Sequence, residues 1–542
     1  MSLNFNTKLL KTTVFFAFAS LAPLAAHAQA TALTLPPEAG ALMTALSAGS
    51  NSDLYAFYEA ADFEPVFAGN AARLSALVTA LESAGLQGLP IQDELINELR
   101  EAMAIAGTPD ANAALEMIAA GAYVEYATDL TSGLLNPNEL SNLINLDAVR
   151  PDTSVLMAKA ASSNGSGALY DGLEPQDPSY NALQEELARL EALVEAGGWG
   201  PKISSGRTLR PGHSNDRVLA LRGRLNALGY EGTDGDSPRY DDALVEAVKA
   251  FQSDNTLNAD GIVGPKTLIA LNSDPSVQMQ QVIVNLERRR WLNYDLGTRH
   301  ILVNQANFTG YVVDYGLPTL VTRVVVGKTG AKFQTPEFID SMTHIVINPS
   351  WNVPQSIASQ EYLPQLQRDP SVLTRQNITM RVRGSGERVD ARLIDMSQYS
   401  QGNFPFVLQQ RPGARNALGR VKFMFPNKYN IYLHDTPARS LFNRDTRTYS
   451  HGCVRVQKPL ELAYTLLAPQ DNDPEGTFAS VRATRRETTI NLEAPVPIYL
   501  TYQTVFLDEN GELAYRVDVY DRDTLVFDAL AENGVTLPEI AS

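Results

Sequence analysis

The chain has 542 residues, of which 61 are acidic and 44 are basic, so its formal net charge at pH 7 is −17. This excess of carboxylates argues against a nucleic-acid partner, because contact with phosphates requires concentrated lysine and arginine. Hydrophobic residues make up 44% of the chain and charged residues 19%, which is typical of a globular protein, and the length suggests three or four domains.

Residues 1–28 have the features of an export signal. Lys8 and Lys11 form a short basic start, an apolar run extends from Thr12 to Ala26, and the segment 26–28 (Ala-His-Ala) offers small residues for cleavage. The apolar run is shorter than the about 20 residues that span a bilayer. We therefore expect a cleaved signal peptide and an exported protein, with an uncleaved membrane anchor as the alternative.

Residues 29–200 are expected to form a helical scaffold domain. Apolar side chains recur there at spacings of three and four residues in two stretches, each followed by glycine: Leu74, Leu77, Val78 and Leu81 before Gly85, and Leu183, Leu187, Leu190 and Val194 before Gly197 and Gly198. A loop at 162–167 divides the two stretches. No group of reactive side chains stands out, so a structural role is predicted.

A compact helical unit is expected at 208–272. One apolar stripe follows Val218, Leu221, Leu225 and Leu228, and a second contains Leu244, Val248 and Phe251. The segments VLALRGRLNALGY, AVKAFQ and DGIVGPKTLIAL resemble a three-helix peptidoglycan-binding domain. The resemblance implies this fold; glycan binding and a spacer role both remain open.

After residue 280 the pattern changes to short β-branched runs, which predict a β-rich domain over 280–480: HILVN, GYVVDY, VTRVVVGK, THIVIN and YNIYLHD. The strand pattern lapses over 350–419, where a helix is expected at 355–367. A long insertion in a compact domain is usually functional, so we expect a helical lid. The runs IYLTYQTVFLD and YRVDVYD predict that 493–542 returns as strands and a helix to the catalytic sheet or its support. The predicted class is a multidomain α+β protein.

Cys453 is the only cysteine of the chain and lies in the stretch TYSHGCVRV. A lone thiol cannot form an internal disulfide, and an unpaired thiol is a liability in an oxidising compartment, so a function is expected for it. It could be a core residue, a zinc ligand with His434 and His451, or a nucleophile. The polar residues before it argue against the core, and the absence of a fourth Cys or His nearby argues against structural zinc. We favour the nucleophile and expect no metal or cofactor.

The chemistry of a thiol nucleophile explains its neighbours. A thiolate attacks carbonyls, but at an ordinary pKa near 8.5 it is scarce at neutral pH. An imidazole, from His434 or His451, can accept the proton and hold the resulting ion pair. Gly452 leaves room for a substrate carbonyl and lets backbone N–H groups converge on an oxyanion.

The residues around the thiol resemble the signature of the L,D-transpeptidase catalytic domain, in which a histidine precedes SHGC by a spacer. Here fifteen residues separate His434 from Ser450. INPSWNVPQSIA, PGARNALGRVKFMFPNKYNIYLHDTP and SLFNRDTRTYSHGCVRVQKPLELA resemble the large multidomain L,D-transpeptidases of Gram-negative cell walls, and FYEAADFEPVF and YATDLTSGLLNP resemble their scaffold domain. The likeness covers nearly the whole mature chain.

The resemblance implies a role for each residue that matches the motif. Cys453 is the nucleophile and His434 the general base, with His451 as the alternative base. The imidazole would be oriented by Asp435, through either its carbonyl or its carboxylate. The remaining expected site residues shape the oxyanion region (Ser450, His451 and Gly452), bind substrate carboxylates (Arg455 and Lys422) or line the pocket (Trp351 and Tyr449).

The resemblance also implies a periplasmic enzyme, inhibited by carbapenems, that forms 3→3 cross-links between meso-diaminopimelate residues of peptidoglycan through a cysteine acyl-enzyme and releases D-Ala from tetrapeptide stems. The lid would exclude water. The alternatives are an L,D-carboxypeptidase, attachment of a lipoprotein lysine to the wall, and a non-enzymatic wall-binding scaffold. The expected partners are stem peptides of the wall, with glycan and partner synthases left open, and the chain is expected to be a monomer.

Overall fold

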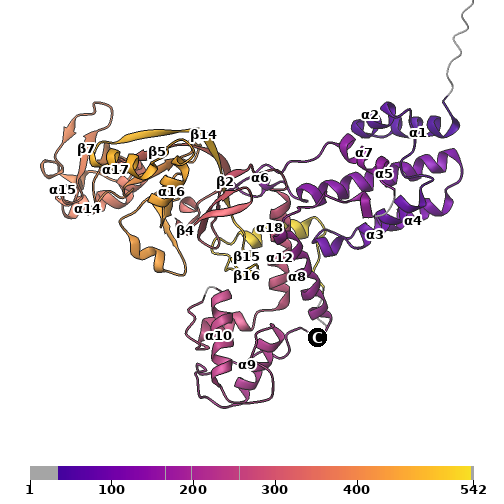
Figure 1. The fold of residues 1–542 in the computed structure, drawn as a ribbon, viewed down its shortest axis with the longest axis horizontal. Helices are drawn as coiled ribbons and strands as arrows, with labels where there is room; N and C mark the ends of the chain where they lie inside the picture. The colour runs from indigo at the N-terminus through magenta and orange to yellow at the C-terminus, as the bar shows by residue number, and fades with distance from the viewer. Residues whose placement is uncertain (1–34, 165–166, 197, 256, 539–542) are drawn as a thin grey trace, which may run out of the picture.

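The computed structural model describes residues 35–164, 167–196, 198–255 and 257–538, so the expected signal peptide lies outside the described residues. Figure 1 shows a helical lobe, a small second helical lobe and a β-rich lobe, which meet around three central helices. Within the described ranges, no helix is both long and apolar enough to cross a membrane.

The first lobe contains the predicted scaffold helices. Its elements are α1 (Pro37–Ala48), α2 (Ser52–Ala60), α3 (Ala71–Glu82), η1 (Ala84–Gln87), α4 (Asp93–Ile105), α5 (Pro109–Ser132), α6 (Pro137–Leu140), α7 (Thr153–Ser162), η2 (Gly167–Leu169) and α8 (Pro178–Glu195). The two predicted stripes lie in α3 and α8, where Leu77 and Leu187 are fully buried. The expected cap at Gly85 is wrong: Gly88, with φ of 64°, ends that segment in the left-handed conformation.

The second lobe is a three-helix unit of α9 (Asp216–Ala227), α10 (Asp242–Asp254) and α11 (Pro265–Leu271). Both predicted stripes are buried in one core, in which Leu221, Leu244 and Val248 are fully buried. The predicted three-helix fold is therefore confirmed.

Three helices from distant parts of the sequence join the lobes. Residues 275–290 form α12 (Pro275–Arg290), so the expectation of a β-rich domain from residue 280 is wrong at its start. Leu187 of α8, Val282 of α12 and Val526 of α18 (Arg522–Glu532) belong to one buried cluster. The scaffold and the sheet thus share a core.

The β-rich lobe is built on one large sheet. Its strands are β1 (Ile144–Asn145), β2 (Arg299–Asn304), β3 (Thr309–Asp314), β4 (Leu317–Gly327), β5 (Glu337–Ile347), β10 (Val421–Met424), β11 (Leu433–His434), β12 (Thr448–Ser450), β13 (Val454–Val456) and β14 (Thr488–Thr501). Their order is β1-β5-β10-β11-β13-β4-β3-β2-β14, and β12 pairs with β4. Because β14 also pairs with β5, the sheet closes on itself. This closed sheet positions the site described below.

The rest of the lobe surrounds this sheet. The other elements are η3 (Ala331–Phe333), η7 (Arg439–Asn443), α16 (Pro459–Leu467), α17 (Pro474–Ala483), β15 (Val505–Leu507) and β16 (Leu513–Tyr515). The tail therefore returns to the sheet through β14. The strand expected from YRVDVYD stops at residue 515, because the chain turns there toward α18.

The insertion at 350–419 is a subdomain with its own sheet. Its helical elements are α13 (Gln355–Ile357), η4 (Ala358–Tyr362), α14 (Leu363–Arg368), α15 (Val372–Arg375), η5 (Ala391–Leu393) and η6 (Met396–Gln398). Its strands are β6 (Trp351–Asn352), β7 (Ile378–Val382), β8 (Arg388–Val389) and β9 (Phe406–Gln410), in the order β6-β9-β7-β8. The helix expected at 355–367 is confirmed, but a purely helical lid is wrong. Phe406 and Leu408 are buried whereas Val407 is 40% exposed, which is the alternation of a half-buried strand.

A buried polar network connects the central helices to the sheet. Arg288 of α12 forms an ion pair with Asp523 of α18 at 2.6 Å, and Arg522 forms one with Glu337 of β5 at 3.0 Å. The guanidinium of Arg522 also donates to the carbonyl of Thr335 at 2.7 Å. Because these charges are removed from water, they have to be paired, and the pairing fixes α18 against the start of β5 and the segment just before it.

Candidate active site

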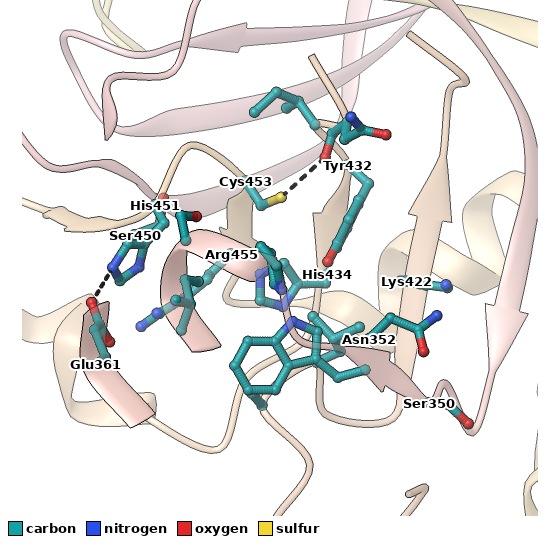
Figure 2. A pocket seen from close by; sticks show the side chains of 18 of the residues that line it. Ser350, Asn352, Glu361, Lys422, Tyr432, His434, Ser450, His451, Cys453 and Arg455 are labelled. Atoms are coloured by element: carbon teal, nitrogen blue, oxygen red, sulfur yellow. Dashed lines mark hydrogen bonds and ion pairs between the residues drawn. The ribbon is translucent and has the colours of Figure 1, made fainter. Parts of the chain in front are cut away.

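A cavity of about 680 Å³ opens where the insertion faces the large sheet. Figure 2 shows Cys453, His434 and Arg455 close together in it, with Lys422 on one side and Glu361 of the insertion on the other. The insertion supplies one wall, and the strands β10, β11 and β13 supply the other. Cys453 is half-buried, so its sulfur lies within the site without being sealed from solvent.

The strand register brings the reactive side chains together. His434 of β11 is the partner of Lys422 on β10 and of Arg455 on β13. Paired residues of neighbouring strands point to the same face of a sheet, so these three side chains form a row. Cys453 lies two residues before Arg455, and Tyr432 lies two residues before His434. Because side chains in a strand alternate with a period of two, both lie on the same face of the sheet as this row.

The backbone of Asp435 orients the imidazole of His434. The Nδ1 atom lies 2.5 Å from the carbonyl oxygen of Asp435, and since a carbonyl can only accept, Nδ1 carries the proton and Nε2 the lone pair. The carboxylate of Asp435 is engaged elsewhere, by Arg420 at 2.8 Å and by the N–H of Thr436 at 2.8 Å. Of the two alternatives left open by the sequence, the carbonyl is the partner.

The two central groups are both neutral at pH 7. Burial, followed by repulsion from Arg455, lowers the pKa of His434 to about 3. Burial raises the pKa of Cys453 to about 11, although hydrogen bonding from Tyr432 and the charges of Arg455 and Lys422 lower it. The sulfur donates to the carbonyl of Asn430 at 3.7 Å. Desolvation thus outweighs the nearby cations in the resting site, and the thiolate–imidazolium pair expected from the sequence stays a prediction.

The loop before the thiol is held by hydrogen bonds that leave one donor available. Gly452 donates its N–H to the buried Ser450 hydroxyl at 3.1 Å, and its carbonyl accepts from the Thr335 hydroxyl at 2.7 Å. Among the described residues, nothing accepts from the N–H of Cys453. Ser450 thus sets the turn, and the N–H of Cys453 is the free donor nearest to the sulfur, as an oxyanion site requires.

His451 is engaged by the insertion and does not face the thiol as a free base. Its Nε2 atom lies 2.5 Å from Oε1 of Glu361 and 3.1 Å from Nζ of Lys328, and its ring packs edge-on against Phe333. Glu361, which sequence analysis could not single out, therefore connects the insertion to the loop of the thiol. No group of three or more His, Cys, Asp or Glu within the described ranges could hold a metal ion.

The two cations of the row have no anionic partner in the part of the chain that the structure describes. Nε of Arg455 is buried and makes no hydrogen bond there, and burial lowers the pKa of this guanidinium. Nζ of Lys422 lies 5.9 Å from the ring centre of Tyr432. Among the described residues that line the cavity, Glu361 is the only carboxylate, and it already contacts His451. A ligand carboxylate would satisfy both cations.

Of the two aromatic residues predicted to line the pocket, one does and the other does not. Trp351 lines the cavity and packs against Tyr362, with 6.4 Å between ring centres. Tyr449 is 40% exposed and lies outside the lining, so its predicted place in the pocket is wrong. Because Ser450 of the same short strand points inward, the preceding side chain points away. Tyr432, which the sequence analysis missed, could have been found from its place two residues before His434.

A lone thiol and a neutral imidazole facing unpaired cations on a closed sheet define a cysteine–histidine site of the acyl-transfer type. Residues 298–494 match the model of the L,D-transpeptidase catalytic domain. Residues 52–187 match that of a scaffold domain, and residues 214–271 match one described as "Putative peptidoglycan binding domain". The chain thus carries a catalytic domain of the L,D-transpeptidases, a family of cysteine-nucleophile acyltransferases, together with a scaffold and a peptidoglycan-binding domain.

Individual relatives agree with this assignment. A protein of Haemophilus influenzae (strain ATCC 51907 / DSM 11121 / KW20 / Rd), named "Putative L,D-transpeptidase", is 30% identical over 281 residues, which are 52% of this chain and 55% of the relative. The match therefore spans about half of that relative's length.

Two solved structures of L,D-transpeptidases also match. One is from Xylanimonas cellulosilytica DSM 15894 (15% identity, TM-score 0.16, covering 56% of this chain and 100% of that one). The other is from Stackebrandtia nassauensis (13% identity, TM-score 0.20, covering 56% and 96%). Scores this low add nothing to the fold assignment.

The buried imidazole predicts a pH-dependent stability. Because the native pKa of His434 is about 3 while an unfolded histidine titrates near 6.5, only the unfolded chain binds this proton between these values. The free energy of unfolding should therefore fall as the pH drops below about 6.5. Urea unfolding at several pH values should give a shallower fall for His434→Gln than for the wild type. An identical slope between pH 5 and 6.5 would contradict the buried neutral imidazole.

Gly452→Ala should destabilise the loop of the thiol. The φ of Gly452 is +114°, and an added Cβ would lie 2.9 Å from Cδ1 of Ile431. A strained backbone of this kind costs about 1–3 kcal/mol, which chemical denaturation should detect. Gly402→Ala is the matched control, since an added Cβ there meets nothing within 4 Å. Equal stability of the two variants would refute the predicted strain.

Proposed function

We propose that this protein is a peptidoglycan L,D-transpeptidase that joins two meso-diaminopimelate residues in a 3→3 cross-link and releases D-Ala from a tetrapeptide donor. The observation that carries the proposal is the row of Lys422, His434 and Arg455 beside Cys453, inside a matched L,D-transpeptidase catalytic domain. The nearby cations suit a donor whose stem peptide bears carboxylates.

In the first step, the sulfur of Cys453 attacks the carbonyl carbon of diaminopimelate while its proton moves to Nε2 of His434. The new S–C bond converts the carbonyl into a tetrahedral oxyanion, toward which the free N–H of Cys453 can donate. The imidazolium then gives its proton to the departing amine of D-Ala, the C–N bond breaks and a thioester remains.

In the second step, the side-chain amine of another diaminopimelate attacks the thioester. His434 takes a proton from this amine and returns it to the sulfur, so Cys453 leaves as a neutral thiol and an amide bond has formed. A neutral Cys453 and a neutral His434 suit both steps, because the imidazole is unprotonated at the start of each step and can accept a proton.

The donor itself would activate the nucleophile. Repulsion from Arg455 is one cause of the lowered pKa of His434. A donor carboxylate bound to Arg455 would offset that repulsion and thereby raise the basicity of the imidazole when substrate is present. Proton transfer from Cys453 would then be favoured in the complex and disfavoured in the free enzyme.

The insertion would restrict access of water to the thioester. Trp351 and Tyr362 supply apolar surface to the cavity wall, and exclusion of water favours the amine over hydrolysis. We also propose that the mature protein acts in the periplasm after export, that carbapenems acylate Cys453, and that the peptidoglycan-binding domain holds the wall.

Intact-protein mass spectrometry with a disaccharide-tetrapeptide donor tests the proposal. The wild type should gain the mass of the donor minus D-Ala on Cys453, and cross-linked dimer should accumulate. Cys453→Ala should show no adduct, and His434→Gln should form it at least about 100-fold more slowly, the usual contribution of a general base. Arg388→Gln, an exposed change on β8, is the control and should react like the wild type.

Each alternative activity has its own outcome in this assay. Accumulation of tripeptide without dimer would identify an L,D-carboxypeptidase, and transfer to an added lysine peptide in preference to diaminopimelate would identify lipoprotein attachment. Absence of any adduct on Cys453 would exclude the three enzymatic alternatives and favour a non-enzymatic wall-binding scaffold.

A further inference from the structure

A second cavity, of about 890 Å³, lies between three parts of the chain. Ser253 and Asn258, at the end of α10 and after it, come from the peptidoglycan-binding lobe, which lies below the β4 and β15–β16 region in Figure 1. Arg323 and Arg447 come from the large sheet and its loops, and Arg516 follows the β15–β16 hairpin. The cavity therefore depends on the assembled chain.

The lining of this cleft is basic although the chain is acidic overall. Its charged residues are five cations, Arg323, Arg444, Arg447, Lys458 and Arg516, and two carboxylates, Asp445 and Glu509. None of the five cations forms an ion pair with another described residue. Asp254 and Asp508 act on Arg516, and Asp445 acts on Arg447, but the lining still holds more cations than carboxylates. In a chain with a net charge of −17, such an excess of cations is unusual and favours an anionic ligand.

Arg447 lies at the centre of this cluster. Within the described ranges, its guanidinium donates only to backbone carbonyls, those of Val324, Arg444, Asn307 and Phe308, at 2.8–3.3 Å. Burial, then repulsion from Arg323, lowers its pKa to about 10, and Arg516 adds to the repulsion while Asp445 opposes it. The fold thus holds Arg447 beside two other arginines without an ion pair to it, and an anion bound among them would relieve their repulsion.

The cleft and the active site lie at opposite ends of the same strand. Cys453 immediately precedes β13, whereas Gln457 and Lys458 follow it and line the cleft. At about 3.3 Å per residue, the five-residue step from Cys453 to Lys458 covers roughly 17 Å. A branched polymer that spans both ends could occupy the cleft while one of its peptides reaches the thiol.

We propose that this cleft binds the carboxylate-bearing peptide arms of a peptidoglycan strand and so aligns that strand with the active site. The inference rests on the proposed function and adds a second binding site to it. Amide and hydroxyl side chains, among them Asn258, Thr309, Asn443 and Gln457, suit the polar groups of peptides. The contact of Arg516 with the carbonyl of Asp254 at 3.1 Å links the cleft to the peptidoglycan-binding lobe.

The test is binding of the full chain to insoluble peptidoglycan in a co-sedimentation assay. Cys453→Ala is the parent, so turnover does not interfere. The cleft variant adds Arg444→Gln and Lys458→Gln together to this parent. Both side chains are exposed, and neither forms an ion pair with another described residue, so the changes break none. Arg383→Gln with Arg388→Gln is the control, because it removes two exposed cations that lie outside both the cleft and the peptidoglycan-binding lobe. Arg323→Gln provides an independent variant of the cleft.

The cleft variants should bind roughly three- to ten-fold more weakly than the parent and lose affinity less steeply with salt, whereas the control should match the parent. An amidase removes the peptides from the glycan. The affinity of the parent for this stripped glycan should be about as low as the affinity of the cleft variants for whole peptidoglycan. Equal affinity of cleft and control variants, or full binding of stripped glycan, would overturn the proposal. Acylation of Cys453 is measured in a separate assay. Failure of the binding test would therefore refute the cleft proposal without refuting the proposed catalytic function.

Discussion

The pairing of β11 with β13 is the constraint on which the site depends. Leu433 is the partner of Val454 and His434 that of Arg455, and both members of the first pair are buried in the sheet core. A shift by one residue would move the apolar pair to the cavity face and the reactive residues into the core. The hydrophobic pattern that folds the sheet therefore also fixes the imidazole beside the thiol and between two cations.

Within that geometry, desolvation decides the charge state. Two cations close to a thiol would normally favour the thiolate, and an imidazole beside them would remain a modest base. In this site burial is the first cause of both shifts, so the free enzyme holds a thiol and an imidazole without charge. A protonated thiol reacts slowly with oxidants, which protects a lone, half-buried cysteine. In the proposed mechanism, activation then depends on a ligand that neutralises Arg455.

Much of the site could be predicted from the sequence, because short motifs on strands keep their geometry. The unique thiol, the spacing from His434 to Ser450 and the charged residues Arg455 and Lys422 all belong to local runs whose alternation indicates a shared face. The role of the Asp435 carbonyl required coordinates, since carbonyl and carboxylate are equally close in sequence. Tyr449 was misplaced because β12 has three residues, too few to reveal its inward side.

The parts that could not be predicted depend on contacts between distant segments. Glu361 reaches His451 across ninety residues. The strands of the insertion were not predicted because prolines and glycines interrupt their sequence pattern. The helix α12 was assigned to the sheet domain because its apolar residues were not separated from the strands that follow. The basic cleft joins three regions, and its cations come from β4, from the segment 444–458 and from Arg516 after β16, so only the folded chain reveals it.

The central claim is that the thiol of the free enzyme is neutral, and the single cysteine makes it directly measurable. The rate of alkylation by iodoacetamide, followed against pH by intact mass, reports the thiolate fraction of Cys453 alone. The account predicts a rate that keeps rising through pH 9 toward an inflection near 11. A plateau reached below pH 8 would show a preformed thiolate and contradict it.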